Sequence, residues 1–216
     1  MVSRRIQTVV SEISGNVLAD IGTDHGYIAI EALRVGCVSR AILCDINKGP
    51  LRRAADNIAA AGLSDCAETR LGNGLSPLRS NEADCISLAG MGGMLITEIL
   101  HDGAEILQSV GKLVLQPQLD VHIVRKFVHS AGYMIADEHM ILEGRFYTIL
   151  SCERGRDTAY SNNEYIFGKH LIERKDDVLK QYLQFKIVEC EKILRVHEVT
   201  EIIKEKDMCG EVLACL

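Results

Sequence analysis

Short apolar runs alternate with longer amphipathic stretches over the first 130 residues of the chain. The apolar runs predict strands, and they cover residues 17–22, 40–46, 66–72, 84–91 and 112–117. The stretches between them predict helices over residues 27–36, 50–61, 93–109 and 120–131. Strands that are apolar on both faces are typical of a parallel sheet covered by helices on both sides. The pattern therefore predicts a doubly wound α/β sheet.

The alternation stops after residue 132. Residues 133–144 and 145–154 both have a strand pattern, with no helix between them and a turn predicted over residues 143–145. Such an antiparallel hairpin at the end of a parallel sheet is typical of the methyltransferase form of the Rossmann-like fold. The all-parallel dehydrogenase form lacks it. We therefore expect a mostly parallel seven-stranded sheet that ends in an antiparallel hairpin.

The C-terminal quarter of the chain has a different pattern. Residues 155–163 are polar and predict a linker, so we expect an α/β domain over 1–155 and a helical hairpin over 156–216. A seam with coiled-coil spacing is formed by Leu179, Leu183, Ile187, Cys190 and Leu194. The facing seam, on a shorter helix, is assigned to Tyr165, Leu171 and Ile172. The charged run over 201–207 is interpreted as a solvated face, and the pattern does not place residues 208–216.

Composition narrows the functional classes. The 216 residues carry a formal net charge of −6 with a pI near 5.7, which counts against a generally basic nucleic-acid binder and leaves a local basic patch open. The eight cysteines include no C-x-x-C pair, so we expect reduced thiols and no metal site. No apolar run is long enough for a membrane span, and the N-terminus lacks the apolar segment of a signal peptide. We expect a cytoplasmic protein.

The turn after the first predicted strand carries an acidic residue. Its residues are Gly22, Thr23, Asp24, His25 and Gly26, so Asp24 stands where dinucleotide-binding turns have their second glycine. A carboxylate there would repel a pyrophosphate and attract an ammonium or a sulfonium. This chemistry favours S-adenosylmethionine (SAM), which carries both cations, over NAD. The alternative is that Asp24 only caps the following helix.

Polar residues also follow the next two predicted strands. Asp45 lies 23 residues after Gly22, the spacing at which a carboxylate accepts hydrogen bonds from ribose hydroxyls. Asn73, between Gly72 and Gly74, is a candidate for the edge of an adenine ring. The alternatives are an ordinary loop aspartate and a turn chosen for its backbone freedom.

The fourth predicted strand ends in Ala-Gly-Met-Gly-Gly, residues 89–93. Three glycines just before a helix make a bare floor that a base or a backbone can approach closely. Methyltransferases of this fold that act on exocyclic amines usually have an Asn/Asp-Pro-Pro-aromatic cluster here, and the chain lacks it. The target is therefore not expected to be an exocyclic amine.

Six motifs occur in order along the chain: DIGTDHGYIAI, NKGPLRRA, GNGL, AGMGGMLI, LVLQP and EGRFYTIL. Together they resemble the bacterial family of tRNA adenine-N1 methyltransferases that modify adenine 22 in the D-arm. The resemblance is strong over residues 1 to about 155. It implies SAM as the methyl donor and a class I methyltransferase fold with a C-terminal, coiled-coil-like helical domain. The chain departs from the family's usual proline, glutamate and aspartate at Ala29, Asp45 and Asn73.

The resemblance also implies a set of site residues. The SAM positions are Asp20, Gly22, Thr23, Asp24, His25, Asp45, Ile46, Gly72, Asn73, Gly74, Ala89, Gly90 and Met91. The substrate positions are Arg5, Gly92 and Gly93. Adenine N1 has an in-plane lone pair, so no base is needed, and Asp24 is the candidate that favours the developing positive charge. His25 either orients Asp24 or the SAM carboxylate, or is structural.

The implied partner is tRNA, with its target base unpaired or flipped out. Candidate phosphate contacts are Arg4, Arg5, Arg52, Arg53, Arg125, Lys126 and Arg145. We expect a monomer or a weak dimer. Three other functions stay open: a SAM-dependent methyltransferase for another RNA or a small molecule, a non-catalytic SAM-binding scaffold, and, disfavoured by Asp24 and the hairpin, an NAD-dependent oxidoreductase.

Overall fold

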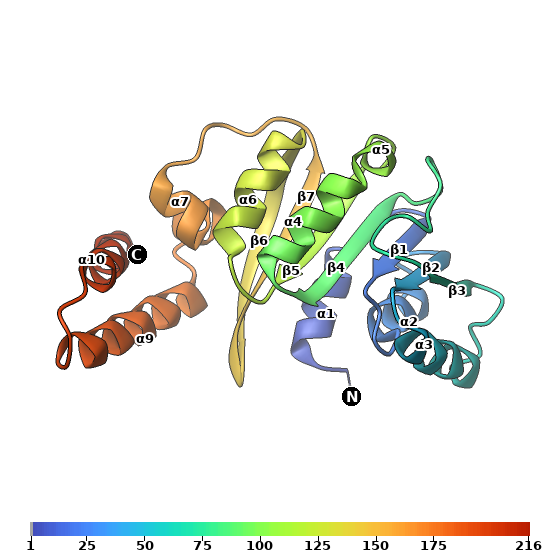
Figure 1. The fold of residues 1–216 in the computed structure, drawn as a ribbon, viewed down its shortest axis with the longest axis horizontal. Helices are drawn as coiled ribbons and strands as arrows, with labels where there is room; N and C mark the ends of the chain where they lie inside the picture. The colour runs from blue at the N-terminus through green and yellow to red at the C-terminus, as the bar shows by residue number, and fades with distance from the viewer. Residues whose placement is uncertain (1) are drawn as a thin grey trace.

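A twisted seven-stranded sheet forms the centre of the computed structural model, which describes residues 2–216 (Figure 1). The strands are β1 Val17–Ile21, β2 Arg40–Asp45, β3 Ala67–Leu71, β4 Cys85–Met91, β5 Lys112–Pro117, β6 Tyr133–Glu143 and β7 Arg145–Arg154. Their order is β3-β2-β1-β4-β5-β7-β6, and only β7 runs antiparallel to its neighbours β5 and β6. The predicted fold, including the terminal hairpin, is confirmed.

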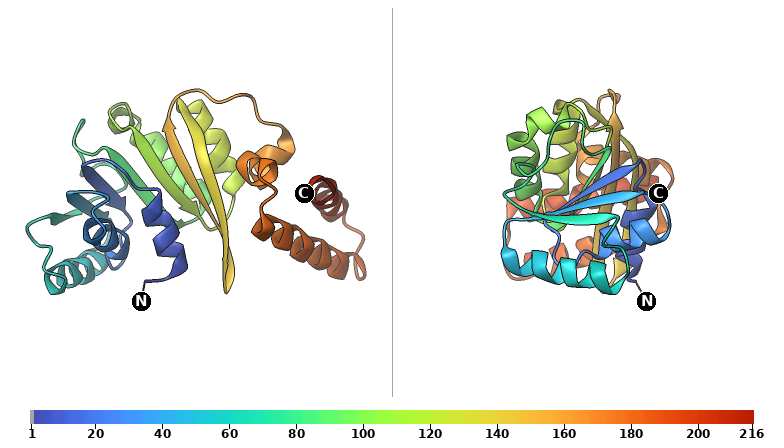
Figure 2. Two further views of the ribbon diagram at one scale, coloured as in Figure 1. Left: turned by 180° about the vertical axis from the view of Figure 1, so that it is seen from behind. Right: turned by 90° about the vertical axis from the view of Figure 1, so that its right-hand side faces the viewer.

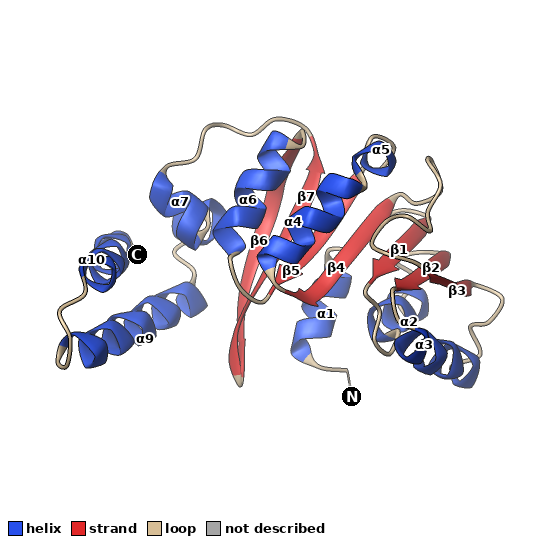
Figure 3. Cartoon of the chain, viewed as in Figure 1, coloured by secondary structure: helices blue, strands red, loops and turns tan. Residues whose placement is uncertain are grey.

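Helices cover both faces of the sheet, as Figure 3 shows. One face carries α1 Arg4–Ser11, α2 Tyr27–Arg34 and α3 Lys48–Ala60, and the other carries α4 Gly93–Asp102, α5 Ala104–Leu107 and α6 Val121–Ser130. Each face has its own apolar core. The single helix expected over 93–109 is divided at Gly103, whose backbone departs from the helical conformation. The Leu75 side chain occupies the space that a Cβ would need there, so the position requires glycine.

The C-terminal helices lie to one side of the sheet (Figure 2). They are α7 Asn162–Phe167, α8 Lys169–Glu173, α9 Asp177–Leu194 and α10 Thr200–Cys215. The predicted hairpin is present, but α9 packs along α10 and not along the segment around Tyr165. Buried Cys209 and Val212 of α10 join the facing seam. Leu171 and Ile172 pack in the same apolar cluster as Leu179 and Leu183, as predicted, whereas Tyr165 packs against the core of the α/β part.

A buried ion pair fixes α7 to the α/β part. Arg125 of α6 and Glu138 of β6 are almost fully buried, and Arg125 Nε donates to Glu138 Oε1 at 2.7 Å. Arg125 Nη1 also donates to the carbonyl oxygens of Tyr165 and Ile166, at 2.8 and 2.9 Å. A Cβ at Gly168, where φ is +99°, would overlap the Glu138 carboxylate. The prediction that Arg125 contacts RNA phosphate is therefore wrong, because this guanidinium is enclosed and neutralised inside the protein.

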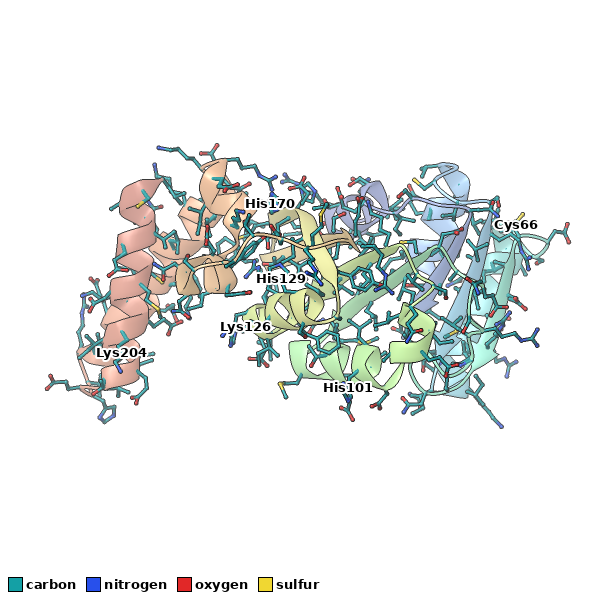
Figure 4. All side chains as sticks on the ribbon, turned by 90° about the horizontal axis from the view of Figure 1, so that it is seen from above. Cys66, His101, Lys126, His129, His170 and Lys204 are labelled. Carbon is teal, nitrogen blue, oxygen red and sulfur yellow. The ribbon has the colours of Figure 1, made fainter. Side chains whose placement is uncertain are left out.

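Other polar residues at the same junction are visible in Figure 4, where Lys126 and His129 of α6 lie on the side of the α/β part that faces the C-terminal helices, and His170 belongs to α8. The ring of His129 contacts the Tyr165 hydroxyl at 3.0 Å, and His170 Nε2 contacts the carbonyl oxygen of Ile135 at 2.7 Å. The C-terminal helices are thus held by polar contacts as well as by apolar packing.

Two further features bear on function. No helix within residues 2–216 is long and apolar enough to cross a membrane. Over the same residues, His, Cys, Asp and Glu side chains form no group of three or more that would hold a metal ion. The eight cysteines are free thiols, and burial raises the pKa of Cys44 and Cys85 to about 12, which keeps both protonated at neutral pH.

Candidate active site

Two adjoining hollows lie at the carboxyl ends of β1 to β4, the edge where open α/β sheets bind ligands. The first, of about 350 Å³, lies between the turn after β1, the end of β4 and helix α1. The second, of about 280 Å³, lies at the ends of β2 and β3. Gly22 and Met91 line both. The hollows therefore form one trough that passes the glycine turn, with the Met91 side chain at its middle.

The glycine turn is pinned to the neighbouring strand. The backbone N–H groups of Gly22 and Thr23 both donate to the carbonyl oxygen of Cys44, at 2.8 and 3.1 Å. Gly22 has φ of +71°, and a Cβ there would overlap the Met91 side chain. Only glycine meets both demands, so the sequence fixes a bare backbone at the centre of the trough.

Asp20 is the buried acid of the first hollow. Only 4% of the residue is exposed, and the Ser87 hydroxyl donates to Asp20 Oδ1 at 2.7 Å. Burial raises the pKa of Asp20, and the hydroxyls of Ser87 and Thr23 oppose this. The Thr23 hydroxyl is buried beside the Asp20 carboxylate. A buried carboxylate with a neighbouring hydroxyl suits a ligand with a cationic, hydrogen-bonding head.

Asp24 lies in a different environment from Asp20. Its side chain is 63% exposed, pairs with the Arg53 guanidinium, and lies 3.2 Å from His25 Nε2. The hydrogen bond from Arg53 is the main reason why the pKa of Asp24 lies below its usual value. The charge of Asp24 is therefore largely balanced within the protein, and its proposed attraction for a cationic ligand stays a prediction.

Tyr27 is a site residue that the sequence patterns missed. Its ring stacks on His25, with centroids 5.2 Å apart and planes 13° from parallel. Tyr27 is 52% exposed and lines the first hollow. The only available signal was an aromatic residue two positions after His25. The stacked pair presents a flat aromatic surface at the mouth of the trough.

The second hollow brings together the remaining predicted SAM positions. Asp45 Oδ1 accepts the backbone N–H of Asn47 at 2.7 Å, which fixes the carboxylate at the end of β2. The hollow is also lined by Ile46, Gly72, Asn73 and Gly74, positions that the family resemblance implies. Their role in SAM binding stays a prediction. A larger hollow of about 410 Å³ adjoins it, sharing Asn73, Gly74, Leu95 and Ile99.

The glycine-rich residues 89–93, at the end of β4 and the start of α4, have two structural roles. Ala89, Gly90 and Met91 line the first hollow, and their place at the methyl end of SAM stays a prediction. Gly93 is buried, and its N–H donates to the carbonyl oxygen of Leu119 at 2.9 Å. A Cβ at Gly93 would press on that backbone, so close packing explains this glycine. Gly92 lines neither hollow. The substrate roles of Gly92 and Gly93 stay predictions.

Arg5 of α1 lines the first hollow, and its role at the substrate stays a prediction. Its Nη1 donates to Oε1 of fully buried Gln116 at 3.0 Å, a partner that no sequence pattern indicated. Of the other candidate phosphate contacts, Arg53 is paired with Asp24. The exposed ones are Arg4, Arg52, Lys126 and Arg145.

Comparison with known proteins decides the family. The family model described as tRNA (adenine(22)-N(1))-methyltransferase matches residues 18–213. The chain belongs to this family. The tRNA (adenine(22)-N(1))-methyltransferase of Bacillus subtilis is 36% identical over 190 residues, which cover 84% of this chain and 80% of the relative.

Solved structures agree with this family assignment. A putative tRNA (m1A22) methyltransferase of Streptococcus pneumoniae, in complex with S-adenosyl-L-methionine, superimposes with a TM-score of 0.92 and 32% identity, over 99% of this chain and 100% of that one. M. capricolum TrmK, bound to the cofactor product S-adenosyl-homocysteine, has a TM-score of 0.88 and 26% identity, over 100% of this chain and 99% of that one. The family fold thus extends over the whole chain, including the C-terminal helices.

Proposed function

We propose that this chain transfers a methyl group from SAM to N1 of adenine 22 in tRNA, in the trough beside the glycine turn. The family match over residues 18–213 carries the proposal, and the trough supplies groups that fit both reactants. SAM, when bound, supplies an electrophilic methyl group on a sulfonium. The chain's own residues bind SAM, position the adenine and stabilise the charge that develops on it.

The trough residues fit the parts of SAM in order. Asp20 and Thr23 offer an acid and a buried hydroxyl to the methionine end, and Gly22, which lines both hollows, forms the turn beside them. Asp45 faces the ribose. The base end and the methyl end are assigned to Ile46, Gly72, Asn73, Gly74, Ala89, Gly90 and Met91, which all line the trough.

Catalysis rests mainly on alignment. Adenine N1 attacks with its own lone pair, so the site needs no general base, and positioning alone lowers such a barrier by several kcal/mol. The stacked Tyr27 and His25 rings offer the unpaired base an aromatic surface at the mouth. Asp24, at the same mouth, favours the positive charge that develops on the adenine ring. Arg53 and His25 hold its carboxylate in place.

The C-terminal helices are assigned to tRNA binding, in a domain spanning residues 156–216. They lie beside the sheet and line neither hollow of the trough, so they extend the surface available to a large substrate. We also place the protein in the cytoplasm, where tRNA is modified, as a monomer or weak dimer. Light scattering at micromolar protein concentration tests the last point.

The test of the proposed function compares substrates. The purified protein and methyl-labelled SAM are incubated with an A22 tRNA transcript, with the same tRNA carrying G22, and with ribosomal RNA. We expect label in the A22 tRNA alone. Equal labelling of the G22 transcript would exclude adenine 22 as the target. Labelling of ribosomal RNA only would identify another RNA methyltransferase, and SAM binding without any transfer would indicate a scaffold.

A further inference from the structure

Two arginines from distant parts of the chain lie over the ring of Tyr147. The guanidinium carbon of Arg5, on α1, is 5.6 Å from the ring centroid, and that of Arg145, on β7, is 4.9 Å away. Arg145 and Tyr147 are two residues apart on one strand, so their side chains share a face of the sheet. Guanidinium groups at these distances are attracted by the ring face. Tyr147 thus gathers two cations on one surface.

The nearby acid is already engaged by the backbone. The two carboxylate oxygens of Glu143, at the end of β6, accept the N–H groups of Arg4 and Arg5 at 3.0 and 3.1 Å. These bonds tie α1 to the tip of the β6–β7 hairpin. They keep Arg5 and Tyr147 in register.

Neither guanidinium is neutralised by a salt bridge within the described residues 2–216. Arg5 donates instead to the neutral amide of Gln116, and Arg145 is exposed. In a chain with a net charge of −6, two guanidinium groups without a salt-bridge partner, beside the single carboxylate of Glu143, leave a local positive patch.

The patch begins at the reaction site and leads away from it. Arg5 lines the hollow that also contains Asp20, Gly22 and Met91. Arg145 lies at the hairpin tip, next to the turn at Gly144. A strand that places one base in the hollow therefore has its backbone beside this line of charge. Guanidinium groups match phosphate oxygens in both charge and geometry.

We propose that Arg5, Tyr147 and Arg145 form a clamp for the RNA backbone beside the target nucleotide. Arg5 contacts the phosphate nearest the target base, and Arg145 contacts a neighbouring phosphate. Tyr147 is the positioning residue that holds both guanidinium groups. The clamp rests on the proposed function, since it takes an RNA strand as its ligand. It also gives a role to the Gly-Arg-Phe-Tyr segment of the hairpin.

The test measures tRNA binding as a function of salt. Arg145→Gln removes one exposed charge, so tRNA affinity should fall several-fold at low salt. The slope of log K against log [salt] should become shallower by about one. SAM affinity should stay unchanged, and KM for tRNA should rise more than kcat falls. The matched control is Arg34→Gln. Arg34 is exposed at the C-terminal end of α2 and lines neither hollow of the trough, so this variant should bind tRNA like wild type.

A second pair of variants tests the ring. Tyr147→Phe keeps an aromatic face and should behave like wild type, whereas Tyr147→Leu should reproduce the defect of Arg145→Gln. Arg145→Gln with the affinity and salt slope of wild type would overturn the proposal. Equal losses in Tyr147→Phe and Tyr147→Leu would also overturn it, because the hydroxyl and not the ring would then matter.

These outcomes are separable from failure of the proposed function. Binding is measured without methyl transfer, so the clamp can be judged even if the transcript is not methylated. Conversely, methylation of A22 with an unchanged salt slope in Arg145→Gln would leave the proposed function standing and remove the clamp.

Discussion

The carboxylate of Asp24 and the guanidinium of Arg53 form an ion pair that joins the glycine turn to α3. Both side chains are about half exposed or more, so solvent screens the pair. The acid that marks the turn in the sequence is thus not a free charge aimed at the ligand. Buried Asp20 lines the same hollow, and less water surrounds it, so its carboxylate has the stronger field when it is ionised.

Asp24→Asn should affect turnover more than SAM binding. The exposed, paired carboxylate contributes little to ligand affinity, so the Kd for SAM should change less than about fivefold. The variant removes the carboxylate that favours the positive charge developing on the adenine ring, so kcat should fall several-fold. Arg53→Gln, which frees the carboxylate, should leave kcat at or above the wild-type value. Steady-state kinetics with saturating tRNA measure kcat for both variants, and an unchanged kcat in Asp24→Asn would remove the catalytic assignment.

Asp20→Asn should change stability and SAM binding in opposite directions. Burial raises the folded-state pKa of Asp20, so the folded protein holds this proton more tightly than the unfolded chain. Stability from Asp20 is therefore present at low pH and is lost as pH rises from the ordinary aspartate range through the raised pKa. An uncharged amide escapes this loss, so the ligand-free variant should melt at a higher temperature than wild type at pH 7.

SAM affinity gives the other half of the Asp20 prediction. A cationic ligand favours the ionised carboxylate, so Asp20→Asn should weaken SAM binding by about ten- to a hundredfold at pH 7. In wild type, SAM affinity should fall as pH drops through the folded-state pKa of Asp20. Calorimetric titrations over a pH series measure this. SAM affinity that is equal in Asp20→Asn and wild type would show that Asp20 does not contact the cationic end.

Arg125→Met should destabilise the protein by about 3–5 kcal/mol, because it leaves buried Glu138 without its partner. The double variant Arg125→Met, Glu138→Leu should recover much of this loss, since no buried charge then remains. Recovery should be incomplete, because the carbonyl oxygens of Tyr165 and Ile166 lose their donor. Urea unfolding at neutral pH measures the three free energies of unfolding. A single variant within about 1 kcal/mol of wild type would contradict the buried-pair interpretation.

Removal of α9 and α10 should separate the two binding functions. A chain that ends at residue 176 keeps the whole trough and the Arg125 junction, so SAM affinity should stay within about twofold of wild type. Methylation of tRNA should be lost. Undiminished methylation would refute a tRNA-binding role for the C-terminal helices. The full-length variant Lys180→Gln, Lys204→Gln, which alters two exposed charges of these helices, checks the same role without truncation.

The sheet was predictable from the sequence because strands buried on both faces leave a simple apolar signal. Strands β1 to β5 lie within a residue or so of their predicted bounds. Helix α10 was not predicted, because charged residues flank its few buried positions, Cys209 and Val212. Its partner helix α9 has a regular seam, and that seam did predict a hairpin.

The trough was predictable for a similar reason. Its predicted residues follow strand ends, and parallel strands bring these ends to one edge. Relationships between side chains on separate elements were not predictable. How the helices dock on the sheet decides three such contacts: Arg5 with Gln116, Arg53 with Asp24, and Arg125 with Glu138. For that reason Arg125, a plausible surface cation in the sequence, proved to be structural.

The most direct measurement is mass spectrometry of nucleosides and nuclease fragments from an unmodified A22 tRNA treated with the protein and SAM. We predict one added methyl group, recovered as 1-methyladenosine in the fragment that contains adenine 22. Full-length, folded tRNA that yields no 1-methyladenosine, or yields it only from a fragment without adenine 22, would contradict the proposed function.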